Sequence, residues 1–420
     1  MTGTTSSKPI AVTGIGILTS LGEGKAENWR RLSAGESGIH RLTRFPIDNL
    51  RTTIGGSVDF LPVDPLDNSN FSFEMARRAA REAIEESGIG PVGHFPGEMF
   101  LAAPPIDLEW SRRMALADRR EATTSYAQLL EIATEGAEEI HRSTINGGIA
   151  ARMMAEFGPQ GSPITLSTAC ASGASAIQLG VEAIRRGSCD TALCIGTDGS
   201  VNAESLIRFS LLSALSTAND PPQAAAKPFS KNRDGFVMAE GAAALVLESY
   251  AAASARGAKI LGVLAGCGEM ADSFHRTRSS PDGKAIIGCI RNAIADAGLA
   301  PDDIDYINPH GTGTPENDKM EYLGVSTVFG DRARSIPISS NKSMVGHTLS
   351  AAGTVEAVFT LLTLQHQRLP PTINYKIPDP AIPLDVVPNT ARDAKVRHAL
   401  SNSFGFGGQN VSLLMSREPA

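Results

Sequence analysis

The sequence lacks an excess of basic residues, a long apolar run and a leader-like start. Its formal net charge is −7 over 420 residues, which excludes general binding to nucleic acid. No apolar run approaches the length of a membrane span. The first residues, MTGTTSSKPIAVTG, lack the basic and apolar regions of a signal peptide. We therefore expect a soluble, cytoplasmic protein that has no membrane span and binds no nucleic acid.

Cysteine is also scarce, and a complete nucleotide fingerprint is missing. The chain has 5 cysteines without CxxC spacing, which argues against a disulfide framework and a zinc site and suits a reducing compartment. The segment VTGIGIL begins like GxGxxG, but Leu18 stands where the last glycine belongs. We interpret its glycines as a turn after a first strand, and we expect no cofactor.

One of these cysteines lies in an unusual setting, between a strand-like and a helical segment. A short apolar run, Ile164 to Leu166, precedes small residues around Cys170, and apolar residues then recur at helical spacing as far as Arg186. The pattern predicts strand, tight turn and helix, with Cys170 in the first helical turn. The helix dipole there favours a thiolate, so we interpret Cys170 as reactive rather than as a small core residue.

The order of elements repeats after residue 257. The helix AREAIEESGI (80–89) aligns with IRNAIADAGL (290–299), and a strand at 259–263 mirrors the first strand. The strand, turn and helix around Cys170 align with Ile336 to Ser339 and the segment 344–364. Each half closes with an apolar strand, at 242–247 and 411–415. We predict an α/β fold made by duplication, with halves at 1–257 and 258–420, in which two mixed sheets alternate with helices.

The second half supplies polar side chains at the ends of its strands. If the halves face each other, the turn NKSMVGH places His347 opposite Cys170, a common arrangement for activating a thiol or stabilising an oxyanion. His310 follows another predicted strand, in PHGTGTPEND. Lys342 precedes His347 in the same loop, and Glu356 on the next helix is a plausible partner for it. The glycine-rich loop SNSFGFGGQN carries Phe404 and Phe406, and it can add a backbone N–H to an oxyanion hole or form a plain hairpin turn.

These motifs together carry a family resemblance. In their order along the chain, STACASG, KPFSKNRDGFVMAEG, PHGTGTPEND, NKSMVGH and SNSFGFGGQN resemble the β-ketoacyl-[acyl-carrier-protein] synthase family over nearly the whole chain. The resemblance implies a thiolase fold of five α-β-α-β-α layers, a homodimer, an acyl carrier protein as partner, and a decarboxylating Claisen condensation of fatty-acid type.

The resemblance also assigns roles to individual residues. Cys170 would hold an acyl chain as a thioester, His310 and His347 would bind the malonyl thioester and stabilise its enolate, and Lys342 would support them. Phe406 would gate the acyl pocket and help to bind the oxyanion. Further expected contributors are Thr312, Thr314, Phe404 and Phe209 at the substrate, Glu356, Asp318 and Asn402 in support, and a structural cation at Asn308, Glu356, Ser401 and Asn402.

Two departures from the family pattern limit what the resemblance implies. The segment LAAPPIDLEWSRR (101–113) replaces a glycine-rich turn and opens a long charged stretch at about 105–145, so chain-length preference is not carried over. Ser213 stands where many members have an arginine that contacts the carrier, and Arg208 or the cluster Arg77 to Arg81 can substitute for it.

Three rival functions stay open at this point. A polyketide or other secondary-pathway ketosynthase shares every motif. A chain-length-factor subunit typically lacks the nucleophile that this chain has. A cysteine hydrolase would need an acidic residue paired with a histidine, and the sequence offers no clear one.

Overall fold

The chain folds around one hydrogen-bonded sheet of ten strands. A computed structural model describes residues 8–105, 110–121, 124–134, 137–145 and 147–419. The strand order is β10-β13-β14-β9-β1-β8-β7-β5-β6, with β2 added beside β1. Their bounds are β1 Ile10–Thr19, β2 Gly22–Glu23, β5 Glu98–Ala102, β6 Ile164–Leu166, β7 Thr191–Asp198, β8 Gly241–Ser249, β9 Gly262–Ala271, β10 Tyr306–Asn308, β13 His398–Phe404 and β14 Gln409–Ser416.

The sheet consists of two halves with the same pattern, joined at their centre. In the first half β6, β5 and β7 are parallel, and β8 and β1 continue antiparallel. In the second half β10 and β13 are parallel, and β14 and β9 continue antiparallel. A bridge from Ile307 to Ile338 supplies the counterpart of β6. The two expected sheets are joined because β1 and β9 pair antiparallel over three residues. This repeat supports the duplication at 1–257 and 258–420 that we propose.

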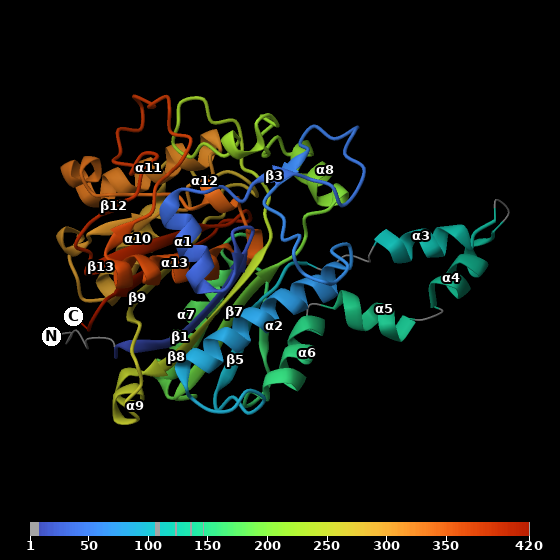
Figure 1. Ribbon diagram of the computed structural model, residues 1–420, viewed down its shortest axis with the longest axis horizontal. Coiled ribbons are helices and arrows are strands. Elements are labelled where there is room, and N and C mark those ends of the chain that lie inside the picture. Colours follow the sequence, from blue (N-terminus) through green and yellow to red (C-terminus); the bar gives the residue numbers. More distant parts are fainter. Residues whose placement is uncertain (1–7, 106–109, 122–123, 135–136, 146, 420) are drawn as a thin grey trace.

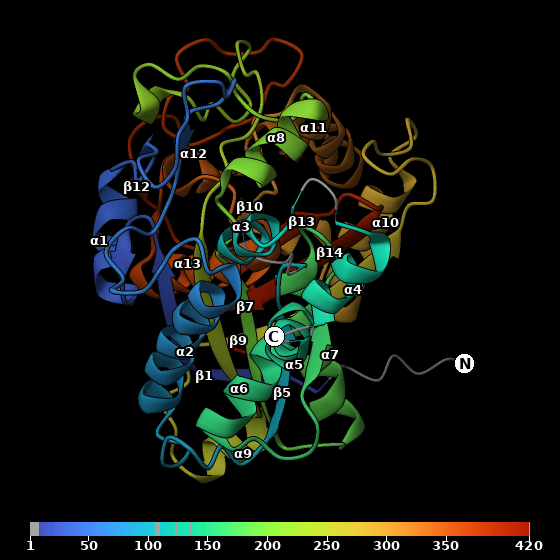
Figure 2. The same ribbon diagram turned by 90° about the vertical axis from the view of Figure 1, so that its right-hand side faces the viewer.

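Helices form three layers around these two half-sheets (Figures 1 and 2). Helices α2 (Asn68–Ser87) and α6 (Gly148–Phe157) pack outside the first half, and α10 (Lys284–Asp296) and α11 (Pro315–Phe329) pack outside the second. Helices α7 (Ser172–Arg186) and α13 (Ala352–His366) lie between the halves and contact each other. From Ala352 to Leu364, α13 is buried all round, as a helix in the centre of a core must be.

The strands are apolar on both faces because helices cover both. In β8, Ala243, Leu245 and Leu247 belong to the central core, whereas Ala242, Ala244 and Val246 belong to the core under α2. Such continuous apolar runs are typical of strands buried on both sides.

The glycines near the start of the chain have a different use from the expected turn. Gly14 and Gly16 lie inside β1, where a Cβ atom would come within 2.0 Å of the backbone oxygens of Ala83 and Ala79 in α2. Gly266 and Gly268 lie inside β9 in the same way, and a Cβ atom on either would come within 2.2 Å of a backbone oxygen of α10. The prediction of a glycine turn was therefore wrong, since these residues let a helix approach its strand closely.

Other predicted elements differ in extent. Helix α2 begins at Asn68, capped by Asp67, and so starts well before the helical segment predicted at 80–89. Strand β9 begins at Gly262 and runs on to Ala271 rather than covering 259–263. The charged stretch after 105 contains three short helices, α3 (Trp110–Asp118), α4 (Tyr126–Thr134) and α5 (Ala137–Thr144), which project from the body (Figure 1).

The remaining short elements lie on the connections between these layers. They are α1 (Lys25–Ala34), β3 (His40–Arg41), β4 (Ile54–Gly55), α8 (Ala203–Leu211), α9 (Tyr250–Ala255), α12 (Lys342–Val345), β11 (Arg368–Leu369) and β12 (Arg392–Asp393). Within the described residues, no helix combines the length and the apolar character needed to cross a membrane.

Candidate active site

The first turn of the site joins β6 to α7 and carries Cys170. Ala169 adopts a left-handed conformation with φ of 49°. The hydroxyl of Ser172 accepts a hydrogen bond from the Thr168 N–H (2.7 Å) and donates one to the Ala169 carbonyl (2.6 Å). Helix α7 begins at Ser172, so Cys170 lies two residues before the helix rather than in its first turn. The tight turn holds the Cys170 side chain at the inner end of a cavity.

A matching turn precedes α13 and carries His347. Leu349, with φ of 46°, adopts the same left-handed conformation as Ala169 in the first turn. Because Cys170 follows Ala169 and Ser350 follows Leu349, Ser350 is the counterpart of Cys170 in the second turn. The His347 backbone donates to the Val237 carbonyl (2.7 Å) and accepts from the Ala239 N–H (2.9 Å), which fixes it against the first half.

The two turns meet because the helices that follow them touch at glycines. A Cβ atom on Gly173 would lie 2.6 Å from the Thr354 nitrogen, and one on Gly353 would lie 2.2 Å from the Ala174 nitrogen. Only residues without a side chain permit this approach of α7 to α13.

His310 comes from a third segment, the loop between β10 and α11. The Glu321 carboxylate accepts hydrogen bonds from the backbone N–H groups of His310 (2.8 Å) and Gly311 (2.7 Å). The Asp318 carboxylate accepts from the N–H groups of Gly313 (3.2 Å) and Phe229 (2.7 Å). Two buried carboxylates on α11 thus fold the loop PHGTGT back over the helix that follows it.

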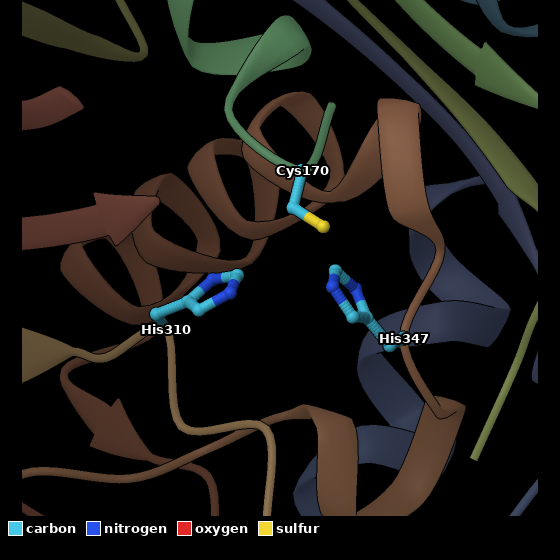
Figure 3. Close-up of side chains that lie close together, drawn as sticks. All are labelled: Cys170, His310 and His347. Carbon is cyan, nitrogen blue, oxygen red and sulfur yellow. The ribbon is translucent and has the colours of Figure 1, made fainter. Parts of the chain in front are cut away.

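These three segments bring Cys170, His310 and His347 together (Figure 3). The Cys170 sulfur and one ring nitrogen of each histidine lie within 4.8 Å of one another. The two imidazoles are nearly perpendicular, at 83°, with centroids 5.3 Å apart. All three side chains are buried. Among the described residues, no carboxylate bonds to either ring.

The two imidazoles are uncharged. Burial lowers the pKa of both histidines well below 6.5, and the neighbouring charge of Lys342 lowers them further. The Leu349 N–H donates to His347 Nδ1 (3.3 Å), so the His347 proton resides on Nε2. His310 Nδ1 has no hydrogen-bond partner in the described structure. A neutral imidazole with a free N–H is a donor for a developing negative charge.

Lys342 contacts the backbone of His310 rather than its ring. Its buried ammonium donates to the His310 carbonyl oxygen (2.6 Å) and forms an ion pair with Glu356, the partner that the sequence suggested. Burial raises the pKa of Glu356 to about 7 against the opposing effect of Lys342. The pair therefore fixes the backbone of His310 and brings a positive charge close to both histidines.

The expectation that Cys170 is a thiolate is not met. Burial raises the pKa of Cys170 to about 11, although Lys342 and the Phe406 N–H both lower it. The loss of water around the sulfur outweighs the backbone N–H groups and the positive ammonium. Cys170 is a thiol at neutral pH.

A cavity of about 480 Å³ leads to the three side chains, and the residues expected at the substrate line it. The Phe406 N–H bonds to the Cys170 sulfur and so lies where an oxyanion donor would be needed. The lining includes Phe209, Thr312, Thr314, Phe404, Phe406 and Ser213. None of the described residues of α3, α4 and α5 lines this cavity.

The residues expected in support are buried close to the loops of the site. The Asn402 amide donates to Glu321 (3.3 Å), and its oxygen accepts from Ser412 (2.8 Å). Glu356 Oε2 and Asn308 Oδ1 are buried without a hydrogen-bond partner in the described structure, and such oxygens suit a hard cation. The Asn402 side chain is already committed, so the set fits a cation only in part. A cation at Asn308, Glu356, Ser401 and Asn402 stays a prediction.

The thiol and the two imidazoles are also the donor types of a zinc site. The sequence nevertheless predicts no metal here, and that prediction is open to a chelator test.

Sequence reasoning missed three residues that shape the site. Glu321 lies in the first half of α11 and is fully buried, and its role depends on the loop that the fold brings back onto it. Phe236 packs edge-on against His347, with centroids 5.2 Å apart. Asp198 ends β7, is buried, and accepts from the Ser350 N–H (3.0 Å) in the second turn. A buried charge directly after an apolar strand was the available signal for Asp198.

Comparisons with known proteins agree with this geometry. The family model "Beta-ketoacyl synthase, N-terminal domain" matches residues 7–253, and "Beta-ketoacyl synthase, C-terminal domain" matches residues 261–376. The 3-oxoacyl-[acyl-carrier-protein] synthase 2 of Coxiella burnetii is 36% identical over 97% of this chain and 98% of its own. The tetracenomycin polyketide synthase ketoacyl synthase alpha subunit of Streptomyces glaucescens is 34% identical over 98% of both chains.

Solved structures show the same fold. A ketosynthase in complex with its type II PKS acyl-carrier protein superposes with a TM-score of 0.85 at 31% identity, covering 98% of this chain and 100% of that one. The ishigamide ketosynthase/chain length factor gives a TM-score of 0.83 at 32% identity over the same shares. The layered α/β arrangement is therefore the thiolase-like fold that was predicted, and the chain belongs to the β-ketoacyl synthase family of condensing acyltransferases.

Proposed function

We propose that this protein extends an acyl chain of fatty-acid type by condensing it with a malonyl group, both delivered by an acyl carrier protein. The observation that carries the proposal is the buried group of one thiol and two neutral imidazoles within 4.8 Å, without a carboxylate on either ring. A general base would need a charged or oriented partner, whereas donors to a developing enolate need only their N–H groups.

The first step transfers the acyl chain to Cys170. The sulfur attacks the carbonyl carbon of the acyl thioester, the new C–S bond forms, and the carrier leaves as a free thiol that takes up the proton lost by Cys170. The tetrahedral oxyanion is stabilised by the N–H groups of Phe406 and Cys170. With a thiol pKa of about 11, the proton leaves during the attack rather than before it.

The second step makes the nucleophile without a strong base. The carboxylate of the malonyl thioester leaves as carbon dioxide, and its bonding electrons form an enolate. His347 donates its Nε2–H, and His310 donates a ring N–H, to the enolate oxygen. The carbanion carbon then attacks the acyl carbonyl on Cys170, the Cys170 thiolate is expelled, and a 3-oxoacyl chain two carbons longer stays on the carrier.

Fatty-acid and polyketide synthesis share this condensation and differ in the product, so the experiment identifies the product. Fatty-acid and polyketide relatives are almost equally similar, at 36% and 34% identity. We expect the purified protein to extend saturated acyl-carrier substrates by one unit per turnover, measured by mass spectrometry of the carrier. Repeated extension to an unreduced poly-3-oxo chain would instead support the polyketide function.

We further propose that the protein acts in the cytoplasm as a homodimer. The five cysteines are all free, which suits a reducing compartment. The rival is a subunit that works only beside a different chain, as the pairing named for the ishigamide protein illustrates. Light scattering of the purified protein, together with turnover in the absence of any other subunit, distinguishes the two.

A further inference from the structure

The mouth of the active-site cavity carries cations that the proposed chemistry does not use. Arg276 and Arg278 lie on the loop 272–279 after β9, and Lys319 lies on α11 across from that loop. All three line the cavity, are exposed, and have no ion pair with any described residue. They are three positive charges at one opening of a chain whose net charge is −7.

Hydrogen bonds hold the arginine loop against the loop that carries Phe406. The Asp272 N–H donates to the Gly408 carbonyl (2.8 Å), and the Gly407 N–H donates to the Arg276 carbonyl (2.8 Å). The Asp272 carboxylate is occupied by the N–H groups of Phe274 (2.9 Å) and Ser280 (2.7 Å). Arg276 is thus fixed at the entrance, beside the gate of the pocket.

The basic groups that sequence analysis suggested for carrier contact are already neutralised. Arg77 and Arg78 both pair with Glu74, at 2.6 and 2.9 Å, and Arg81 pairs with Glu156 at 2.6 Å. Arg208 pairs with Glu204, also at 2.6 Å. Since Ser213 replaces the arginine of many family members, the free charges at the mouth belong to Arg276, Arg278 and Lys319. The carboxylate of Glu316 also lies at the mouth and partly offsets them.

We propose that Arg276 and Arg278 bind the phosphate of the phosphopantetheine arm on which the carrier presents its thioester. The inference rests on the proposed function, in which the thioester of the carrier's phosphopantetheine arm reaches Cys170 while the phosphate of the same arm stays at the mouth. A guanidinium matches a phosphate with two parallel hydrogen bonds, which a lysine cannot make. The phosphate would occupy the cavity entrance, and the neutral arm would follow the cavity past Thr312 and Thr314.

The test compares two small substrates that differ only in this phosphate. Acyl-phosphopantetheine and acyl-pantetheine are given to the wild-type protein and to the double variant Arg276→Gln/Arg278→Gln, and acylation of Cys170 is followed by mass spectrometry. We expect the phosphate to raise the acylation rate constant per substrate concentration about tenfold in the wild type, and most of that ratio to be lost in the variant. Arg291→Gln, an exposed arginine on α10, is the matched control and keeps the ratio.

Each outcome decides the inference. An equal ratio in the variant and the wild type overturns it. A loss seen only with the intact carrier protein, and not with acyl-phosphopantetheine, also overturns it, because the arginines would then contact the carrier surface. If neither substrate acylates Cys170 in the wild type, the proposed function itself fails, which is a different result.

Discussion

Removing the buried ammonium of Lys342 is the perturbation with the clearest expected size. In Lys342→Met, the Glu356 carboxylate keeps its burial and loses its cation, and the His310 carbonyl oxygen loses a donor at 2.6 Å. Breaking a buried ion pair from one side costs about 3–5 kcal/mol of folding free energy. The double variant Lys342→Met/Glu356→Gln carries no unpaired charge, so we expect it to recover most of this loss.

The pH dependence of the variant follows from the pKa of Glu356. Its folded value, about 7, lies above the ordinary value of 4.5, so the stability that this carboxyl contributes is full below pH 4.5 and is lost as the pH rises to about 7. Lys342 lowers that pKa, and without Lys342 the pKa rises further. In Lys342→Met the free energy of unfolding therefore keeps falling above pH 7, by up to about 1.4 kcal/mol per pH unit.

Urea unfolding at pH 7 and pH 8.5 measures this difference. We expect Lys342→Met to lose about 2 kcal/mol more than the wild type over the interval. Lys25→Met removes the partly exposed pair with Glu86 and serves as the control, with a cost within about 1 kcal/mol. Parallel pH profiles of the wild type and Lys342→Met would refute the reasoning.

Three further predictions test the surroundings of the thiol. Asp198→Asn removes a carboxylate that raises the pKa of Cys170, so iodoacetamide should alkylate Cys170 about twofold to fivefold faster at pH 9; an unchanged rate would contradict this. Gly353→Ala places a Cβ 2.2 Å from the Ala174 nitrogen, and we expect it to lower the free energy of unfolding by about 1–3 kcal/mol and to abolish condensation. Gly147→Ala is the control, because open space surrounds Gly147, and its free energy of unfolding in urea should stay within about 0.5 kcal/mol of the wild type. A chelator should leave the condensation rate unchanged, and loss of activity with recovery on adding zinc would show a metal site instead.

Sequence patterns predicted the parts of the fold that depend on local apolar periodicity and on repetition. The strands β8 and β14 lie where apolar runs predicted them, since burial on both faces leaves a continuous apolar run in the sequence. The strand predicted at 259–263 falls short of β9, which runs on to Ala271, because a segment with glycines at 266 and 268 resembles a loop until the helix that needs those glycines is in place.

The protonation state of Cys170 could not be predicted from the sequence, because it too depends on segments that are distant along the chain. The position of Cys170 beside a helix start suggested a thiolate, but the pKa depends on how completely three other segments exclude water from the sulfur. The roles of Glu321 and Asp198 depend likewise on which backbone N–H groups the tertiary fold brings to them.

The central claim is that Cys170 carries the acyl chain that the malonyl-derived carbanion attacks. It is tested most directly by incubating the protein with an acyl-carrier substrate alone, digesting it, and measuring the mass of the peptide that contains Cys170, before and after adding malonyl-carrier. We predict one acyl group on Cys170, which disappears on malonyl addition as a 3-oxoacyl-carrier two carbons longer forms with release of carbon dioxide. Release of the acyl chain as a free acid, or condensation retained in Cys170→Ala, would contradict the account.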